Sequence, residues 1–492
     1  MNPLYIFLAI GIWAFFGLII ANKARKKLGS GVSEFYIGGR KAGGFVSALT
    51  YAATTFSAFM MVGLVGLVFD SGVVAMGFEL IYILSTVVLL FVFAPRFWVA
   101  SKEFGYSTPP DLLADRFGDK KVGIVSAGLS MIWLIPYASA QLMGVGVLFS
   151  IFTGGTISYM TGVLLMAVFS GVAAIIAGFK SVSWTDAFQG MTMLIASLIL
   201  VFFVFNHFYG GAVEFFSTIS MGSPDLLSIN WDLQMFIGMT LPWAFFAVSN
   251  PQVSQRLFVS NNIKSIKRMI IGFSIFALIY TIVTTLFGFS ISNLVGQGVL
   301  SGSVGVADEA MPVLLKNVPT ILALITFTGI FAAATSTLGS LILTLSSLGT
   351  ENIVKPLKPE FSEKKRVRIG RFIILILLAA CVLFALGRFD LIAVVSVWAS
   401  GGLLVAVPSF FAAFFWKDAT SEGVIWSILV AGVLTGALYF SGFNPLGVWP
   451  PVWGLLTSIV TLVGVSKFTQ SDGKGETFIE KVREGVNDHG FK

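Results

Sequence analysis

The chain has 492 residues, of which 56% are hydrophobic and only 11% are charged. A water-soluble globule cannot bury so many apolar side chains, so this composition excludes that class and predicts an all-α protein that crosses a lipid bilayer many times. The net charge of +7 does not predict nucleic-acid binding, because no folded basic domain stands apart from the apolar stretches.

Apolar stretches of roughly 20 residues are the predicted membrane spans, because about 20 helical residues cross ~30 Å of hydrocarbon. The sequence holds thirteen such stretches, at residues 3–22, 44–69, 73–95, 122–151, 157–179, 185–208, 234–255, 269–293, 319–348, 371–387, 391–416, 423–440 and 447–466. We therefore expect about 13 transmembrane helices.

The basic residues fall almost entirely on one side of these predicted spans. That side receives Lys23, Arg25, Lys26, Lys27, Arg40, Lys41, residues 96–121, Lys180, residues 256–268, residues 355–371, Lys417 and the C-terminal tail. The other side receives only Lys316 and Arg388. Because short basic loops stay in the cytoplasm, we expect a plasma-membrane protein whose N-terminus lies outside the cell and whose C-terminus is cytoplasmic.

The second apolar stretch is interrupted at residues 48–58, where five residues carry hydroxyl groups. Small and polar residues at mid-depth are tolerated in a bilayer only where the helix is buried in protein or lines a cavity, because unsatisfied backbone groups cost several kcal/mol in hydrocarbon. This segment is the first predicted site of function.

A second interruption lies five helices further along, where Pro242, Asn250 and Pro251 break residues 234–255. Secondary transporters commonly contain inverted repeats whose discontinuous helices hold the solute near the bilayer midplane. We therefore expect a 5+5 inverted-repeat core like that of amino-acid transporters, with a discontinuous first helix in each repeat. The predicted parts are an extra N-terminal helix and basic cytoplasmic loop at residues 1–41, the first five-helix repeat at 42–210, the second at 232–416, two additional helices at 417–466 and a cytoplasmic tail at 467–492.

Two carboxylates lie inside or at the edge of predicted spans, where ionisable residues are rare and usually functional. Asp186 stands at the cytoplasmic start of the sixth span, a position that the helix dipole also favours for a carboxylate without a function. Glu79 lies some seven residues into the third span, where it could face a solvated vestibule or a solute.

Small hydroxyl residues form a third cluster at residues 332–340 (AAATSTLGS), in the middle of the ninth span. Such residues often only allow helices to pack closely. Beside the carbonyls of a broken helix, however, paired hydroxyls supply the oxygen ligands that a small hard cation prefers. A monovalent ion at this place would need no carboxylate.

With these clusters the chain resembles the sodium:solute symporter family, whose members include sodium-coupled proline, sugar, pantothenate, sialic acid and monocarboxylate carriers. The resemblance covers most of the chain. It rests on residues 36–40 (YIGGR), residues 48–66, residues 108–119 (TPPDLLADRFGD), residues 184–186 (WTD) with Gln189, Gln255-Arg256 and Ser336-Thr337.

This resemblance implies a sodium site and its ligands. They would be the backbone carbonyls of Ala53, Phe56 and Ala333 with the hydroxyls of Ser336 and Thr337. It also implies that Asp186, with Ser340, serves the cytoplasmic exit of sodium or a second ion site. Two-sodium relatives carry serines three and four positions after the first hydroxyl ligand, whereas this chain has Gly339 and Ser340. One sodium ion per cycle is therefore the prediction.

The solute is less well defined by the resemblance. Proline-type carriers have an aspartate where this chain has Thr55, which argues against proline. The polar contacts of the sugar carriers on the third helix are not matched at the expected spacing. The candidate pocket residues, chosen for polarity or aromaticity at apparent mid-depth, are Thr54, Thr55, Ser57, Glu79, Tyr82, Tyr137, Trp243, Asn250, Gln252, Ser396 and Trp398.

The sequence thus predicts sodium-coupled symport of a small organic solute, an amino acid or a carboxylate being favoured, into the cell by alternating access. Proton coupling through Glu79 or Asp186 and sodium-coupled sugar symport remain open, and an ion channel is a remote alternative without a pore-loop repeat. No catalytic constellation predicts an enzyme. The expected partners are sodium, the solute and the lipid bilayer; the oligomeric state is left open, and a monomer is expected to suffice.

Overall fold

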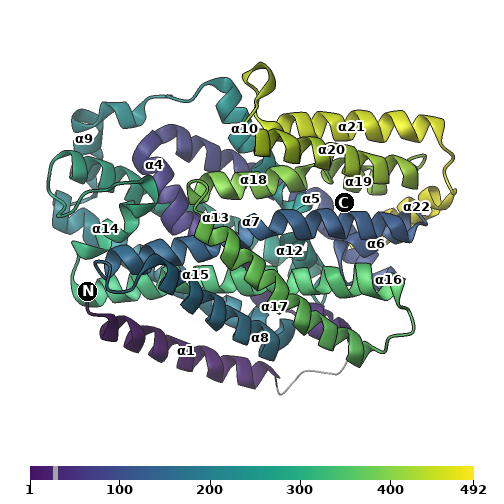
Figure 1. The fold of residues 1–492 in the computed structure, drawn as a ribbon, viewed down its shortest axis with the longest axis horizontal. Helices are drawn as coiled ribbons and strands as arrows, with labels where there is room; N and C mark the ends of the chain where they lie inside the picture. Colours follow the sequence, from purple (N-terminus) through teal and green to yellow (C-terminus); the bar gives the residue numbers. More distant parts are fainter. Residues whose placement is uncertain (26–31, 492) are drawn as a thin grey trace.

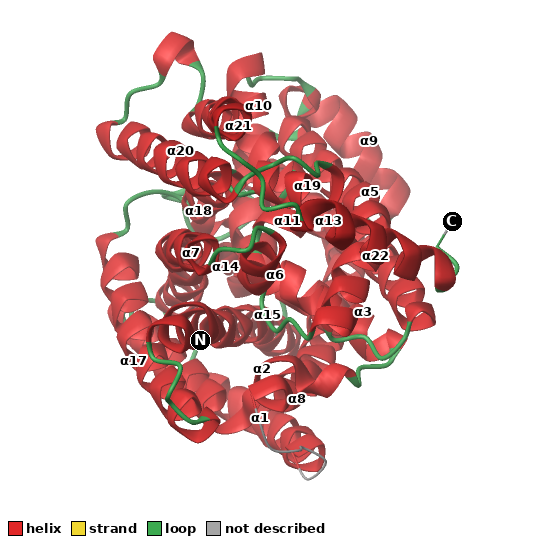
Figure 2. Ribbon diagram, turned by 90° about the vertical axis from the view of Figure 1, so that its right-hand side faces the viewer, coloured by secondary structure: helices red, strands yellow, loops and turns green. Residues whose placement is uncertain are grey.

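The architecture is helical throughout the residues that the structure, a computed structural model, describes, namely 1–25 and 32–491. Figure 2 shows this directly, since every regular element in it is a helix. In Figure 1 the long helices lie side by side, with α1 (Pro3–Arg25) along one edge and α20 (Ser421–Ser441) and α21 (Pro450–Phe468) along the opposite edge. The composition predicted this class.

The other helices follow in chain order. The first part contains α2 (Val32–Ile37), η1 (Gly38–Arg40), α3 (Gly44–Thr55), η2 (Phe59–Leu64), α4 (Val65–Ser71), α5 (Val73–Phe104), α6 (Pro109–Arg116), α7 (Lys120–Phe152), α8 (Tyr159–Val204) and η3 (Phe205–Tyr209). The middle contains α9 (Ala212–Gly222), η4 (Pro224–Leu227), α10 (Leu233–Ala244), α11 (Phe246–Ser249), α12 (Pro251–Ser254), η5 (Gln255–Phe258), α13 (Ile263–Gly296), η6 (Ala307–Glu309) and α14 (Ala310–Lys316). The last part contains α15 (Thr320–Ser347), η7 (Leu348–Val354), α16 (Lys355–Leu357), α17 (Glu363–Gly387), α18 (Ile392–Leu404), α19 (Val407–Phe415), η8 (Pro445–Gly447) and α22 (Lys474–Asp488).

Ten helices among the described residues are long and apolar enough to cross a bilayer, or up to eleven if the bent pair Gly44–Thr55 and Phe59–Ser71 counts as one span. The two other predicted spans correspond to shorter segments, namely Tyr159–Ile175 at the start of α8 and the run from α10 to α12. The chain is therefore a multi-pass membrane protein with about ten spanning helices. The number thirteen and the repeat stay predictions.

Helix α8 is bent, as the contacts of two of its residues with one side chain of α1 show. The ring of Trp13 lies 6.3 Å from the ring of Phe169 and 6.3 Å from that of Phe188. In a straight helix two residues 19 positions apart would be separated by about 28 Å along the axis. The apolar segments on the two sides of the bend therefore lie near each other, as expected for two spans rather than one.

The first predicted interruption is a break between α3 and η2. The two helical directions differ by 53°, and Phe56 between them takes an extended conformation (φ −94°, ψ 122°). Side chains satisfy the backbone there: Ser57 Oγ accepts from the amide of Phe59, and the amide of Ala58 donates to Gln141 Oε1 on α7 at 3.1 Å. The polar residues of this segment are thus what lets a helix break inside the bundle.

The second interruption also breaks a helix, between α10 and α12. Pro242 lies inside α10, which ends at Ala244, and Asn250 is extended (φ −94°, ψ 108°) between α11 and α12. Pro251 then begins α12, where its missing amide hydrogen costs nothing. Residues 250–258 are all buried, so the segment from the second break through η5 lies inside the protein.

Two cations that the orientation prediction assigned to loops are buried instead. Arg116 is 1% exposed and donates to the carbonyls of Ala413 and Trp416. Arg256 is 2% exposed and lies among helices. Arg116 ends the short helix α6 and Arg256 lies in η5, and sequence position does not reveal the hydrogen bonds that accompany their burial. Lys26 and Lys27 of the same prediction lie outside the described residues.

The C-terminal tail, predicted at residues 467–492, forms helix α22. Phe478, Val482 and Val486 recur at helical spacing and are buried, and the ring of Phe478 stacks on that of Phe104 at 5.3 Å. This apolar stripe anchors the tail on α5, at the end of the molecule that carries Lys41, Arg96 and Lys417. We call this the basic end; it is the predicted cytoplasmic end.

Candidate ion site and solute pocket

The polar cluster of α15 faces the break after α3. The hydroxyl of Ser336 donates to the carbonyls of Ala53, at 2.8 Å, and Ala333, at 2.9 Å. The hydroxyl of Thr337 donates to the same Ala53 carbonyl at 3.1 Å. Helical geometry would pair that carbonyl with the amide of Ser57, but the extended Phe56 turns the chain away and leaves the oxygen for α15. Four of the five predicted sodium ligands therefore meet.

Phe56, the fifth predicted ligand, lies at the break itself. Its ring stacks on Phe273 and on Phe276 of α13, at 5.8 Å in each case. This packing holds the backbone of the break in place from the side of α13. A hydroxyl that donates to a carbonyl can rotate and turn its lone pairs toward a cation, so the cluster has the chemistry of an oxygen-lined site for a small cation.

Asp186 lies in a buried polar network with three other helices. Its Oδ2 accepts from the hydroxyl of Thr50 at 2.7 Å and from Ser340 at 3.4 Å. The guanidinium of Arg256 forms an ion pair with it at 3.3 Å, donates to Ser340 and donates from Nε to Thr54 Oγ1 at 3.1 Å. The network thus connects α3, α8, α15 and η5.

Arg256 is the member of this network that the sequence analysis did not place in a site. In the sequence analysis this arginine was assigned to a cytoplasmic loop and counted among the family motifs, but it was not included in a binding site. The available signal was its position directly after the second broken helix, beside Gln255. That glutamine is buried too, and donates to the carbonyl of Ser107 at 2.8 Å and accepts from Thr344 at 3.0 Å.

Aromatic rings gather between the two breaks, and we call them the aromatic cluster. The ring of Trp243 on α10 stacks on Phe59 at 4.7 Å and on Phe246 at 5.0 Å. Tyr82 meets Trp243 edge-on at 5.2 Å, and Tyr137 does so at 6.3 Å. The cluster comprises Phe59, Phe78, Tyr82, Tyr137, Trp243 and Phe246.

The structure brings together some of the predicted solute residues but not all. Tyr82, Tyr137 and Trp243 belong to the aromatic cluster. Thr54 instead bonds within the Asp186 network, and the Ser396 hydroxyl donates to the Ile392 carbonyl of its own helix. Trp398 packs on Tyr439 at 5.8 Å, and Ser57 supports the break. Asn250 donates a hydrogen bond to Ser249 and accepts one from Gln252. Thr55 and Glu79 are buried without a hydrogen-bond partner among the described residues.

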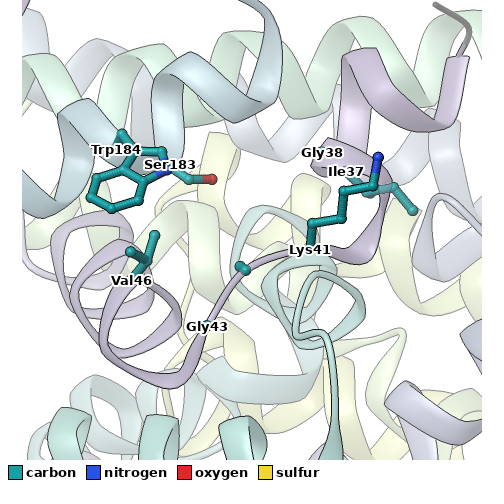
Figure 3. A pocket seen from close by; sticks show the side chains of 8 residues that line it. Ile37, Gly38, Lys41, Gly43, Val46, Ser183 and Trp184 are labelled. Carbon is teal, nitrogen blue, oxygen red and sulfur yellow. The ribbon is translucent and has the colours of Figure 1, made fainter. Parts of the chain in front are cut away.

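A pocket opens near the Asp186 network at the basic end. Its lining is Ile37, Gly38, Lys41, Ala42, Gly43, Val46, Ser183 and Trp184. Figure 3 shows Trp184 and Lys41 on opposite sides of it, with the Ser183 hydroxyl between them. Val46 is four residues from Thr50, and Ser183 is three from Asp186, so the network lies about one helical turn further inside.

A broken helix whose carbonyl meets the hydroxyls of a second helix, inside a helical multi-pass protein, has the architecture of secondary transporters. The fold is similar to that of a Na+-coupled sialic acid symporter in a substrate-bound outward-open state, with a TM-score of 0.80, 17% identity, and coverage of 95% of this chain and 98% of that one. It is also similar to Mhp1, a nucleobase-cation-symport-1 family transporter in a closed conformation with bromovinylhydantoin bound, with a TM-score of 0.56, 13% identity, and coverage of 91% and 98%. At these identities the likeness concerns the fold.

The particular family follows from the sequence. The profile of the sodium:solute symporter family matches residues 35–431, and the chain belongs to this family. A sodium/proline symporter of Staphylococcus aureus (strain JH9) is 26% identical over 508 aligned residues, which cover 98% of this chain and 96% of that relative. The family resemblance predicted from the motifs is thereby confirmed.

Proposed function

We propose that this protein is a sodium-coupled symporter that carries a small organic solute into the cell by alternating access. The observation that carries the proposal is the convergence of the Ser336 and Thr337 hydroxyls on the Ala53 carbonyl at the break after α3. An ion held there joins a helix of the first predicted repeat to a helix of the second. Family membership supports the same conclusion.

Sodium entering from outside would tie α3 to α15 through these oxygens. Because Phe59 of the aromatic cluster follows the same break, ordering the break also orders one wall of the solute pocket. Each ligand then raises the affinity for the other by the same factor, as linkage requires. Separation of α3 from α15 in the inward-facing state would remove ligands and release sodium toward Asp186 and the pocket of Figure 3. The membrane potential assists with ~2.3 kcal/mol per charge per 100 mV.

One sodium ion per cycle is part of the proposal. The guanidinium of Arg256 already supplies a positive charge at Asp186 and uses the Ser340 hydroxyl. A second sodium ion would have to displace it. The proposed topology has 13 spans in a 5+5 inverted-repeat core, with the N-terminus outside and the C-terminus in the cytoplasm of a plasma-membrane protein.

Proton coupling is the second candidate, and one observation favours it. Glu79 is buried in α5 without a charged partner among the described residues, as expected of a carboxylate that takes up and releases a proton. Asp186 is less suited to that role because Arg256 pairs with it.

Uptake into proteoliposomes under separate gradients distinguishes the two. Purified protein is supplied with amino acids, monocarboxylates and sugars, under an inward sodium gradient or an inward proton gradient. We expect accumulation of an amino acid or a carboxylate under the sodium gradient alone. Accumulation that needs only the proton gradient would overturn sodium coupling, and sodium-driven accumulation of a sugar alone would correct the solute class.

A further inference from the structure

Glu79 is a carboxylate that lacks a partner in the helical bundle. It lies on α5 and is 0% exposed, and neither of its oxygens has a hydrogen-bond partner among the described residues. None of the ion pairs of the described residues includes it. A buried charge left unpaired costs several kcal/mol. A proton or a cationic group of the solute would remove that cost.

The surroundings of Glu79 favour a cationic group. Tyr82, less than one turn further along α5, and Tyr137 on α7 both lie within electrostatic range of the carboxylate. Both rings also meet Trp243. The faces of Tyr rings attract ammonium groups, most strongly where water is excluded, whereas the Trp243 ring is already stacked on Phe59 and Phe246. A carboxylate close to two tyrosine rings combines the two features that recognise a positively charged nitrogen.

Other solute chemistries fit this place less well. A simple carboxylate would bring a second negative charge next to Glu79, in surroundings where like charges repel strongly. A sugar would offer hydrogen bonds but leave the charge uncompensated. The indole Nε1 of Trp243 is a buried hydrogen-bond donor without an acceptor among the described residues. It could donate to a carbonyl or carboxylate oxygen of a solute whose ammonium group faces Glu79.

We infer that the solute carries an ammonium group, which binds between the Glu79 carboxylate and the rings of Tyr82 and Tyr137. The inference rests on the proposed symport, since it concerns the solute of that cycle. It selects amino acids and amines over the simple carboxylates and sugars. Glu79 is then a determinant of specificity rather than a carrier of the coupling proton.

Methylammonium is the minimal probe, with acetate and glucose as the anionic and neutral comparisons. The melting temperature of the purified protein is measured in sodium buffer with each compound, since a ligand that binds the folded state raises it. We expect methylammonium to raise the melting temperature of the wild type more than acetate or glucose does. Glu79→Gln should weaken the apparent affinity for methylammonium by about tenfold or more. Glu103→Gln, an exposed carboxylate of the same helix, should leave it unchanged.

Two controls separate this inference from the sodium site. Ser336→Ala with Thr337→Ala should remove stabilisation by sodium and, through the lost linkage, weaken but not abolish stabilisation by methylammonium, which shows that the probe does not bind at the sodium site. Tyr82→Leu, which removes one of the two tyrosine rings, should weaken the binding of methylammonium a few-fold and serves if Glu79→Gln does not fold.

The inference is overturned if methylammonium does not stabilise the wild type, if Glu79→Gln binds it unchanged, or if acetate or glucose stabilises more strongly. It is also overturned if Glu79→Gln keeps the methylammonium effect but loses proton-driven uptake, because Glu79 is then the proton carrier. Loss of sodium-driven uptake in the wild type, with the methylammonium results as expected, would refute the symport proposal and leave the ammonium site standing.

Discussion

Replacing Arg256 with methionine tests whether its ion pair with Asp186 holds the interior of this conformation together. The guanidinium is bonded to side chains of α3, α8 and α15, so a single substitution releases contacts with three helices. Methionine keeps a similar length of apolar side chain but carries no charge.

The expected loss follows from what Arg256→Met leaves behind. Asp186 is 1% exposed and, among the described residues, would keep only the hydroxyls of Thr50 and Ser340 as hydrogen-bond partners. Removal of one member of a buried ion pair typically costs about 3–5 kcal/mol, because the other charge stays buried and uncompensated. Removal of both charges, in Arg256→Met with Asp186→Leu, should recover most of that loss.

Thermal unfolding of the purified variants provides the assay, with folding checked by size-exclusion chromatography. Arg371→Met, an exposed arginine of α17, is the matched control and should change the melting temperature little. The reasoning is wrong if Arg256→Met is as stable as the wild type, or if the losses of the two single variants simply add in the double variant.

Two further predictions concern α4 and the loop that packs on it. Burial raises the pKa of Asp308 from 3.8 to about 7. Between these two pH values the unfolded chain binds fewer protons than the folded chain, so the free energy of unfolding falls as the pH rises. Asp308→Asn should flatten that part of the pH profile of the melting temperature, and an unchanged slope would contradict the assignment. Gly66→Ala places a Cβ 2.4 Å from the Ala307 carbonyl oxygen, and should cost about 1–3 kcal/mol through forced displacement of that loop, whereas Gly464→Ala, with open space around it, should not lower the melting temperature.

The helical class and the first break could be predicted from the sequence, because each leaves a local mark. Apolar length predicts spans, and polar residues such as Thr54 and Ser57 at mid-depth predict a break. The pairing of Ala53 with Ser336 came from the family motif, since no local rule joins residues 283 positions apart.

What the sequence did not reveal depends on where side chains point. Arg256 lies at the end of a predicted span, where a basic residue normally faces the cytoplasm, and only the packing of η5 turns it inward. Trp398 was predicted to line the pocket from its aromatic ring and apparent depth, but that ring packs on Tyr439 of α20. The sequence of a helix that is apolar all round does not show which of its sides faces the protein interior, because such a helix has no distinct polar face.

Sodium dependence of uptake in the variant Ser336→Ala with Thr337→Ala tests the central claim most directly. Thr335→Ala is the matched control, because its hydroxyl donates to the Phe331 carbonyl of its own helix at 2.7 Å and not to the break. The account predicts that the double variant inserts into the membrane normally and loses sodium-stimulated uptake, while Thr335→Ala keeps it. Normal sodium dependence in the double variant would contradict the account.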